Sequence, residues 1–385
     1  MDFELPAETD PARQEVRGWL AAHPQPSGRQ LADAGYVAPH LPRPWGLDAD
    51  PIQQIVIDDE LKRANVRRPI NPIGIGWAGP TLVHAGTPEQ QARYLPRLLS
   101  GEDIWCQLFS EPGAGSDLAS LGTRAFRDGD EWVINGQKIW TSLAQYARYG
   151  ILIARTDSDV AKHQGITYFV CPMDLPGIEI RPIIEMTGGH TFNEVFFTDV
   201  RLPADAVVGE VNNGWSLAKV TLGNERVSLS NGGALWGMGP TGGDLLDRVR
   251  AGGGCDDPLM RQRLARIHTT EEILRLIRLR TVSARIRGEQ PGAEASIRKV
   301  LADEHGQHIM GVAKDLGGAG GMLTDGDESG PTGTSWDFGF LFAPALTVGG
   351  GTGEVQRNIL AERVLGLPHD LDVEQGKTWA EARRG

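Results

Sequence analysis

The sequence predicts an α+β protein in which a β domain lies between two helical domains. Residues 1–103 and 214–385 carry apolar residues at helical spacing, whereas residues 104–213 carry short β-branched and aromatic runs separated by turn residues. With 385 residues the chain is long enough for two or three domains. We therefore expect an N-terminal all-α domain (1–103), a middle β-barrel or sandwich domain (104–213) and a C-terminal helical bundle (214–385).

One helix of the first domain is marked at both ends. In GTPEQQARYLPRLLSGE, residues 86–102, Thr87 is suited to cap the helix, Pro88 fits its first turn and Gly101 ends it.

The middle domain is predicted from a hairpin and four further strands. In EWVINGQKIW, residues 131–140, Asn135-Gly136 predicts a type I′ turn. The strands that follow are expected in YGILIART, GITYFVC, IEIRPII and NEVFFTDVRL.

Three long helices are predicted in the last domain. One begins at Asp257-Pro258 and ends near residue 288, and the next runs from about Pro291 to Leu316. The third begins in TVGGGTGEVQRN, residues 347–358, and ends near Gly366. This glycine cluster predicts positive φ angles or the close approach of a ligand, and a tight loop with nothing bound is the alternative.

Composition excludes several classes of protein. The net charge of −12 argues against nucleic acid or an anionic membrane as the main partner. Three well-separated cysteines indicate neither a disulfide framework nor a zinc site. The first residues lack the pattern of a signal peptide and no apolar run reaches 18 residues, so we expect a cytoplasmic protein that is not inserted in a membrane.

Motifs for common catalytic sites are missing, but one loop carries suitable chemistry. The sequence has no P-loop, no Rossmann glycine pattern within a βαβ unit, no H-E-x-x-H and no G-x-S-x-G. In CQLFSEPGAGSDLAS, residues 106–120, the hydroxyls of Ser110 and Ser116 are suited to bond a polar heterocycle and an acyl chain's amide links. Trp140 is suited to stack on an aromatic ring system, with Thr141 or Ser142 at its edge. A structural turn and a core tryptophan are the alternatives.

Three motifs together resemble the acyl-CoA dehydrogenase family: SEPGAGSD (110–117), NGQKIWTS (135–142) and GGTGEVQRNILAERVLG (350–366). The resemblance covers nearly the whole chain. It implies the family fold, with a C-terminal four-helix bundle, and FAD bound between the β domain and the bundle. It also implies an acyl-CoA substrate, a homo- or hetero-oligomer, and electron-transfer flavoprotein as the acceptor.

The resemblance assigns roles to single residues. Ser110 matches the hydroxyl at the flavin pyrimidine edge, Trp140 and Ser142 match the groups near flavin N5, and Ser116 lies on the thioester side. Gly317 and Gly318 match a glycine pair at the adenine end of a neighbour's site. The expected cofactor-binding residues are Gln107, Phe109, Ser110, Gly115, Trp140, Thr141, Ser142, Gly317, Gly318, Thr352 and Gln356.

The chain departs from the family pattern at the catalytic base. Many members carry a glutamate two residues before the threonine that matches Thr352, and this chain has Gly350 there. Other members place the base on the first helix of the C-terminal domain, where LGNERVSL supplies Glu225 and Arg226. We therefore expect Glu225 to be the base, and Ser116, Arg226 and Gly350 to contact substrate.

A second departure concerns assembly. The family's arginine-x-x-phenylalanine-glycine segment, which holds the FAD pyrophosphate of an adjacent subunit, is not matched in residues 245–265. Either Arg261 or Arg263 substitutes for it, or a partner chain supplies the contact. The expected activity is α,β-dehydrogenation of an acyl-CoA. The alternatives are a flavin oxidase or monooxygenase on the same fold, and a subunit of a heteromer that shares its FAD site.

Overall fold

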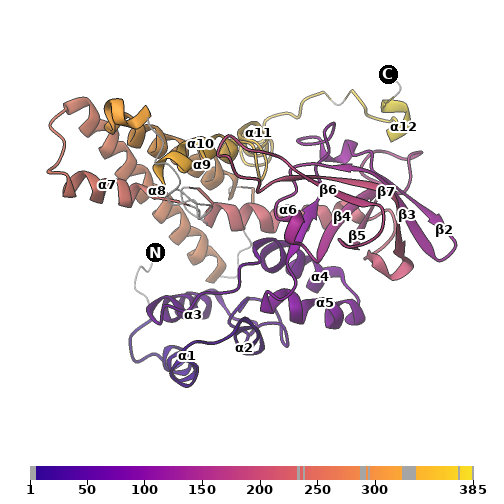
Figure 1. Cartoon of the computed structure of the whole chain (residues 1–385), viewed down its shortest axis with the longest axis horizontal. Helices are drawn as coiled ribbons and strands as arrows, with labels where there is room; N and C mark the ends of the chain where they lie inside the picture. The colour runs from indigo at the N-terminus through magenta and orange to yellow at the C-terminus, as the bar shows by residue number, and fades with distance from the viewer. Residues whose placement is uncertain are drawn as a thin grey trace. The chain divides into compact units, whose positions relative to one another are not determined.

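The computed structural model describes residues 6–231, 235–236, 239–286, 292–293, 295–322, 335–371 and 373–383, without the side chains of residues 226–231, 282, 285–286 and 295. The described residues form two compact units (Figure 1). One unit contains residues 6–184, 190–224 and 371–383 and is called the αβ unit. The other contains residues 185–189 and 225–370 and is called the helical unit.

The αβ unit begins with short helices. They are α1 (Pro11–Ala22), α2 (Gly28–Asp33), α3 (Pro51–Arg63), α4 (Gly79–Ala85) and α5 (Pro88–Ser100). All of them except α4 have a side-chain cap at the N-terminus. The predicted helix after residue 86 is confirmed, because the Thr87 hydroxyl accepts from the Gln90 N–H and Gly101 ends α5 in a left-handed conformation.

Eight strands of the αβ unit form one mixed sheet in the order β6-β7-β3-β2-β4-β5-β8, and β1 pairs with β4 in parallel. Their bounds are β1 (Trp105–Leu108), β2 (Arg124–Asp128), β3 (Glu131–Lys138), β4 (Tyr149–Arg155), β5 (Ile166–Pro172), β6 (Ile178–Pro182), β7 (Asn193–Pro203) and β8 (Val207–Val208). The predicted order of helices, strands and helices is confirmed, and the boundaries at residues 103 and 213 stay a prediction.

Both faces of the sheet are apolar and buried at its central strands β4 and β5. Successive side chains of a strand point to opposite faces, so Ile151 and Ile153 of β4 join the cluster that includes the N-terminal helices. Leu152 and Ala154 belong to a second cluster, with Trp132 and Phe169. The loops that leave these strands are therefore anchored to a sheet that is packed on both of its faces.

The prediction of a turn at Asn135-Gly136 is wrong. These residues lie inside β3, and the hairpin turns at Gly129, which has φ +62°, between the paired residues Asp128 and Glu131. At Gly136 the β3–β7 register shifts, which marks an irregularity of the bulge type. A Cβ there would lie 2.7 Å from Thr123 Cα, so glycine is required by close backbone approach.

The helix that begins the C-terminal domain, α6 (Gly214–Asn231), enters the helical unit at Glu225. The other helices of that unit are α7 (Gly242–Ala251), α8 (Pro258–Ile286), α9 (Ala295–Leu316), α10 (Trp336–Phe342) and α11 (Gly353–Arg363). Helix α9 packs against α8, α10 and α11. A short helix, α12 (Trp379–Ala382), belongs to the αβ unit.

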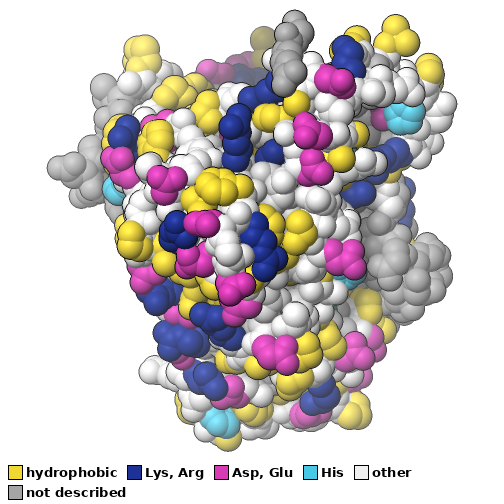
Figure 2. Space-filling model, turned by 90° about the vertical axis from the view of Figure 1, so that its right-hand side faces the viewer, with side chains coloured by type: hydrophobic (Ala, Val, Ile, Leu, Met, Phe, Trp, Pro, Cys, Tyr) yellow, Lys and Arg dark blue, Asp and Glu magenta, His cyan; other side chains and the backbone are white. Residues whose placement is uncertain are grey.

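Charged side chains of both signs are mixed on one face of the molecule (Figure 2). On the face drawn in Figure 2, lysine and arginine side chains lie among acidic ones and form no continuous basic surface. None of the helices that the structure describes is both long and apolar enough to span a membrane.

Candidate functional site

The loop between β1 and β2 is held by a buried ion pair. Glu111 accepts hydrogen bonds from Lys138 Nζ at 2.8 Å and from the N–H groups of Gly122 at 2.6 Å and Thr123 at 2.9 Å. Lys138 Nζ also donates to Phe109 O at 2.9 Å. Burial alone would raise the pKa of Glu111, but these contacts bring its pKa below the ordinary value.

This pair closes the SEPGAGSD segment into a loop whose tip faces solvent. Glu111 and Ala114 exchange backbone hydrogen bonds, and Gly115 and Ser116 are exposed. Ser110 is half-buried, and its carbonyl accepts from Ile139 N–H at 2.9 Å. The loop is therefore tied directly to the segment that follows β3.

Trp140 leaves β3 in a strained conformation. Its φ is +60°, a left-handed value that costs about 1–2 kcal/mol for a residue with a side chain, and 57% of its surface is exposed. Strain of this kind is typical of functional sites when the surrounding structure fixes it. The next residue supplies that fixation, since Thr141 and Asn193 exchange backbone hydrogen bonds of 3.0 and 3.1 Å.

The Thr141 hydroxyl is buried and has no hydrogen-bond partner among the residues that the structure describes. A buried hydroxyl without a partner is costly, so this oxygen is suited to bond a ligand. Ser142 follows half-buried. Gln107 lies on β1 opposite Ile151, and Phe109 is buried and stacks edge-on to Tyr168. The αβ unit thus brings one set of predicted residues onto adjoining loops.

A buried hydroxyl network fixes the first turns of α6. Thr221 Oγ1 lies 2.9 Å from Thr81 Oγ1 and 3.0 Å from Tyr168 OH, which joins α4, β5 and α6. At the start of the helix a Cβ on Gly214 would lie 2.6 Å from the backbone of β5. Sequence reasoning missed this network, because isolated threonines carry no pattern.

Glu225 lies one helical turn after Thr221 and is 7% exposed. Among the described residues the other buried glutamate is Glu60, whose carboxylate is bound by Arg13 and Arg17. Burial of a carboxylate is costly unless it interacts with other groups, and Glu225, like Glu60, has such an interaction. The backbone of Arg226 continues α6, but its side chain lies outside the description.

The glycines before α11 are required by positive φ angles and by a close contact. Gly350 and Gly351 have φ values of +67° and +88°, and a Cβ on Gly349 would lie 2.6 Å from the Trp236 ring. Thr352 caps α11, with its hydroxyl accepting from Val355 N–H at 3.2 Å. Gln356 is fully buried and donates to Gly350 O at 3.3 Å, so the expected side chains gather at one turn.

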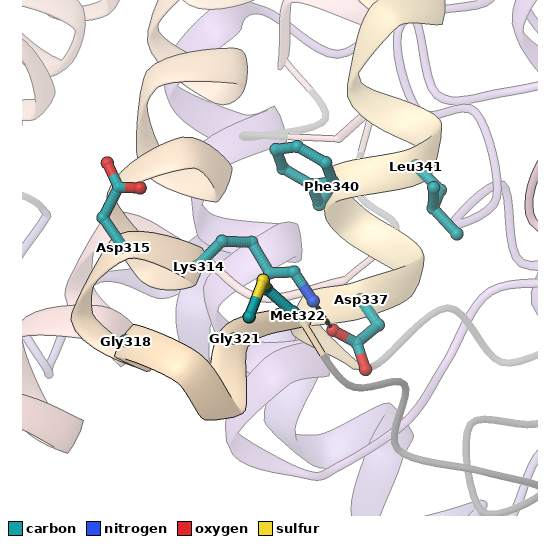
Figure 3. Close-up of a pocket in the computed structure, with 8 residues that line it drawn as sticks. All are labelled: Lys314, Asp315, Gly318, Gly321, Met322, Asp337, Phe340 and Leu341. Atoms are coloured by element: carbon teal, nitrogen blue, oxygen red, sulfur yellow. Dashed lines mark hydrogen bonds and ion pairs between the residues drawn. The ribbon is translucent and has the colours of Figure 1, made fainter.

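Gly317 and Gly318 lie at the end of α9, beside a pocket of about 570 Å³ in the helical unit. Figure 3 shows that Lys314 reaches across this pocket to Asp337 of α10 in an ion pair. Of the two arginines considered for the unmatched segment, Arg263 pairs with Asp315 of the pocket lining at 2.6 Å.

Family models match three successive parts of the chain. Residues 7–102 match the acyl-CoA dehydrogenase N-terminal domain, residues 106–200 the middle domain, and residues 212–365 the C-terminal domain.

Two relatives from Mycobacterium tuberculosis are similar over most of the chain. Acyl-CoA dehydrogenase IpdE1 is 40% identical over 95% of this chain and 91% of its own length. Acyl-CoA dehydrogenase FadE34 is 43% identical over 88% of this chain, and the match spans 45% of the length of FadE34.

Two solved structures are similar in fold along nearly the whole chain. The Tcur3481-Tcur3483 steroid ACAD has a TM-score of 0.78 and 31% identity, covering 96% of this chain and all of that one. The ChsE4-ChsE5 complex from Mycobacterium tuberculosis has a TM-score of 0.77 and 32% identity, with the same coverage. The chain therefore belongs to the acyl-CoA dehydrogenase family, whose members are FAD-dependent flavoprotein oxidoreductases.

Proposed function

We propose that the protein removes two hydrogens from the α and β carbons of an acyl-CoA thioester, with Glu225 as the base. The observation that carries this proposal is the buried carboxylate of Glu225 on α6, in a chain where position 350 is a left-handed glycine. A glycine supplies no proton acceptor, and Glu225 supplies one in a desolvated setting of the kind that favours general-base chemistry.

The residues of the αβ unit fit a flavin. Trp140 presents an exposed indole in a fixed backbone conformation, and the Thr141 hydroxyl needs a hydrogen-bond partner. In this proposal Gln107, Phe109, Ser110, Gly115 and Ser142 complete the isoalloxazine contacts, and Ser116 faces the thioester. In the same proposal Thr352 and Gln356 contact FAD, Gly317 and Gly318 contact the adenine end of FAD in a neighbour's site, and Gly350 and Arg226 contact substrate.

The protein and the cofactor divide the chemistry. Bound FAD accepts the β-hydride when the substrate is oxidised. Glu225 takes the α-proton, and preorganised N–H donors stabilise the negative charge that develops on the thioester carbonyl.

We infer a branched or polycyclic acyl group for the substrate. Gly350 leaves room where many family members carry a glutamate, and a structure with 31% identity is named a steroid ACAD. The test is a panel of linear, branched and steroid acyl-CoAs added to the purified protein without air. Bleaching of the flavin absorbance by the polycyclic members is expected, and bleaching by none of the panel would contradict the function.

A flavin oxidase or monooxygenase on the same fold is the competing function, and the acceptor distinguishes the two. The proposed dehydrogenase passes electrons to electron-transfer flavoprotein or a dye and is reoxidised slowly by air. Fast reoxidation of the reduced protein by oxygen, with formation of hydrogen peroxide, would favour the oxidase.

We further propose that the protein assembles as an oligomer in which a different chain supplies part of the FAD site. Arg263 is engaged by Asp315, the arginine segment of the family is unmatched, and the ChsE4-ChsE5 structure is a complex of two named chains. The chain purified alone should bind less than one FAD per subunit, and co-expression with a second acyl-CoA dehydrogenase chain should raise that ratio. One FAD per subunit in the chain alone would refute the heteromer.

A further inference from the structure

The end of the chain folds onto the αβ unit. After α11, residues 371–383 belong to that unit, where they contact the β4–β5 loop. The N–H groups of Trp379 and Ala380 donate to Val160 O at 2.8 Å and Ser158 O at 3.0 Å. Glu374 pairs with Lys162 at 2.7 Å. We call residues 373–383 the C-terminal tail.

The tail also binds the 3₁₀ turn Leu118–Ser120, which directly follows the SEPGAGSD segment and ends its loop. Ser120 O accepts from Arg383 Nη2 at 2.9 Å and from Trp379 Nε1 at 3.4 Å. The preceding carbonyl, that of Ala119, accepts from Arg155 at 2.5 Å. Two consecutive carbonyls of this turn are thus held by side chains from outside it.

Trp379 is the centre of this contact. It is 8% exposed, and the guanidinium groups of Arg155 and Arg383 lie 5.0 and 5.1 Å from its ring. Cation–π contacts of this geometry are stabilising, and more so where water is excluded. The ring therefore joins the strand end that carries Arg155 to the tail that carries Arg383.

Arg383 lies above the base of the loop. A Cβ on Gly122 would lie 3.2 Å from Arg383 Nη1, and one on Gly113 would lie 3.9 Å from Nη2. Glu111 ties the base of the loop, through Lys138 and through the N–H groups of Gly122 and Thr123. The tail adds a further attachment near the end of the loop, at Ser120.

We propose that the C-terminal tail positions the SEPGAGSD loop for ligand binding, with Trp379 and Arg383 as positioning residues. The proposal rests on the proposed function, in which Ser110 and Ser116 of this loop contact FAD and the thioester. Between Glu111 and Asp117, whose carboxylate accepts from Lys162 Nζ at 2.9 Å, the loop is exposed at Gly113, Gly115 and Ser116. Without the tail, the end of the loop would lose part of its order, which the ligand would then have to supply, and that ordering weakens binding.

The test uses the full chain, with any partner it requires, and the variants Trp379→Ala and Arg383→Ala. Amide hydrogen exchange at residues 113–120 should become faster, while exchange in β4 and β5 stays unchanged. The KM for the best acyl-CoA should rise on the order of tenfold, with kcat nearly unchanged, since only the ordering of about one residue is lost.

Three further variants serve as controls. Lys377→Ala alters an exposed tail residue and should leave both measurements unchanged. Trp379→Phe keeps an aromatic ring between the two guanidinium groups, and Arg383→Lys keeps the charge, so both should recover most of the wild-type protection.

The outcomes separate this proposal from the proposed function. Unchanged exchange at residues 113–120 in both alanine variants would overturn it. Faster exchange with an unchanged KM would overturn the role in ligand binding. If no acyl-CoA reduces the wild-type flavin, the proposed function fails, whereas the exchange data still decide whether the tail holds the loop.

Discussion

Glu225→Gln is expected to lower the rate of flavin reduction by an acyl-CoA on the order of 10²–10⁴-fold, because the amide has nearly the shape of the carboxylate but accepts no proton. FAD content should stay at the wild-type level, since none of the proposed FAD contacts is changed. Rapid mixing of the oxidised protein with its best acyl-CoA, without air, measures this rate directly.

The matched control is Glu354→Gln. Glu354 is an exposed glutamate in the first turn of α11, two residues after the cap Thr352, and its replacement should leave the rate close to that of the wild type. Normal reduction by Glu225→Gln would place the base elsewhere. If Glu354→Gln reduces the flavin slowly while Glu225→Gln does so normally, the base is Glu354 and our assignment of Glu225 is wrong.

Glu111→Gln is expected to lower the free energy of unfolding by about 3–5 kcal/mol, because it leaves the ammonium group of Lys138 buried without a counter-charge. The loosened loop should also lose FAD, since Ser110 is joined to Glu111 in the chain. Urea unfolding followed by tryptophan fluorescence gives the stability, and the ratio of flavin to protein absorbance gives the FAD content.

The double variant Glu111→Gln with Lys138→Met is the decisive comparison. It removes both charges, and replacement of a complete buried pair by uncharged groups is often nearly neutral, so it should recover much of the lost stability. Glu179→Gln, which breaks the exposed pair with Arg181, should leave unfolding unchanged. A stability loss in the double variant as large as in Glu111→Gln would contradict the ion-pair explanation.

The sequence predicted correctly the elements whose ends are set by residues close to them in the chain. Thr87, Pro88 and Gly101 each act within one helical turn, and the predicted helix is found between them. The prediction from Asn135-Gly136 was wrong because this dipeptide occurs both in tight turns and at irregularities within strands. The choice between them depends on Thr123, a residue of the neighbouring chain segment that the local sequence does not reveal.

The candidate site was predictable from motifs only where the residues proposed to contact ligand are clustered in sequence. SEPGAGSD and NGQKIWTS drew attention to loops that the structure places side by side through the Ser110–Ile139 hydrogen bond. The supports of the site were not predictable. Lys138 and Glu111 are 27 residues apart, and Arg383 reaches Ser120 over 263 residues, so neither contact leaves a periodic pattern.

The two left-handed glycines before α11, Gly350 and Gly351, affect which positions can acquire a catalytic carboxylate in evolution. Any residue with a side chain at position 350 would meet a backbone held at φ +67°, and would cost about 1–2 kcal/mol there before contributing any chemistry. A codon change that introduces a glutamate at this turn therefore begins at a disadvantage. A carboxylate that arises at another position of the chain does not meet this backbone cost.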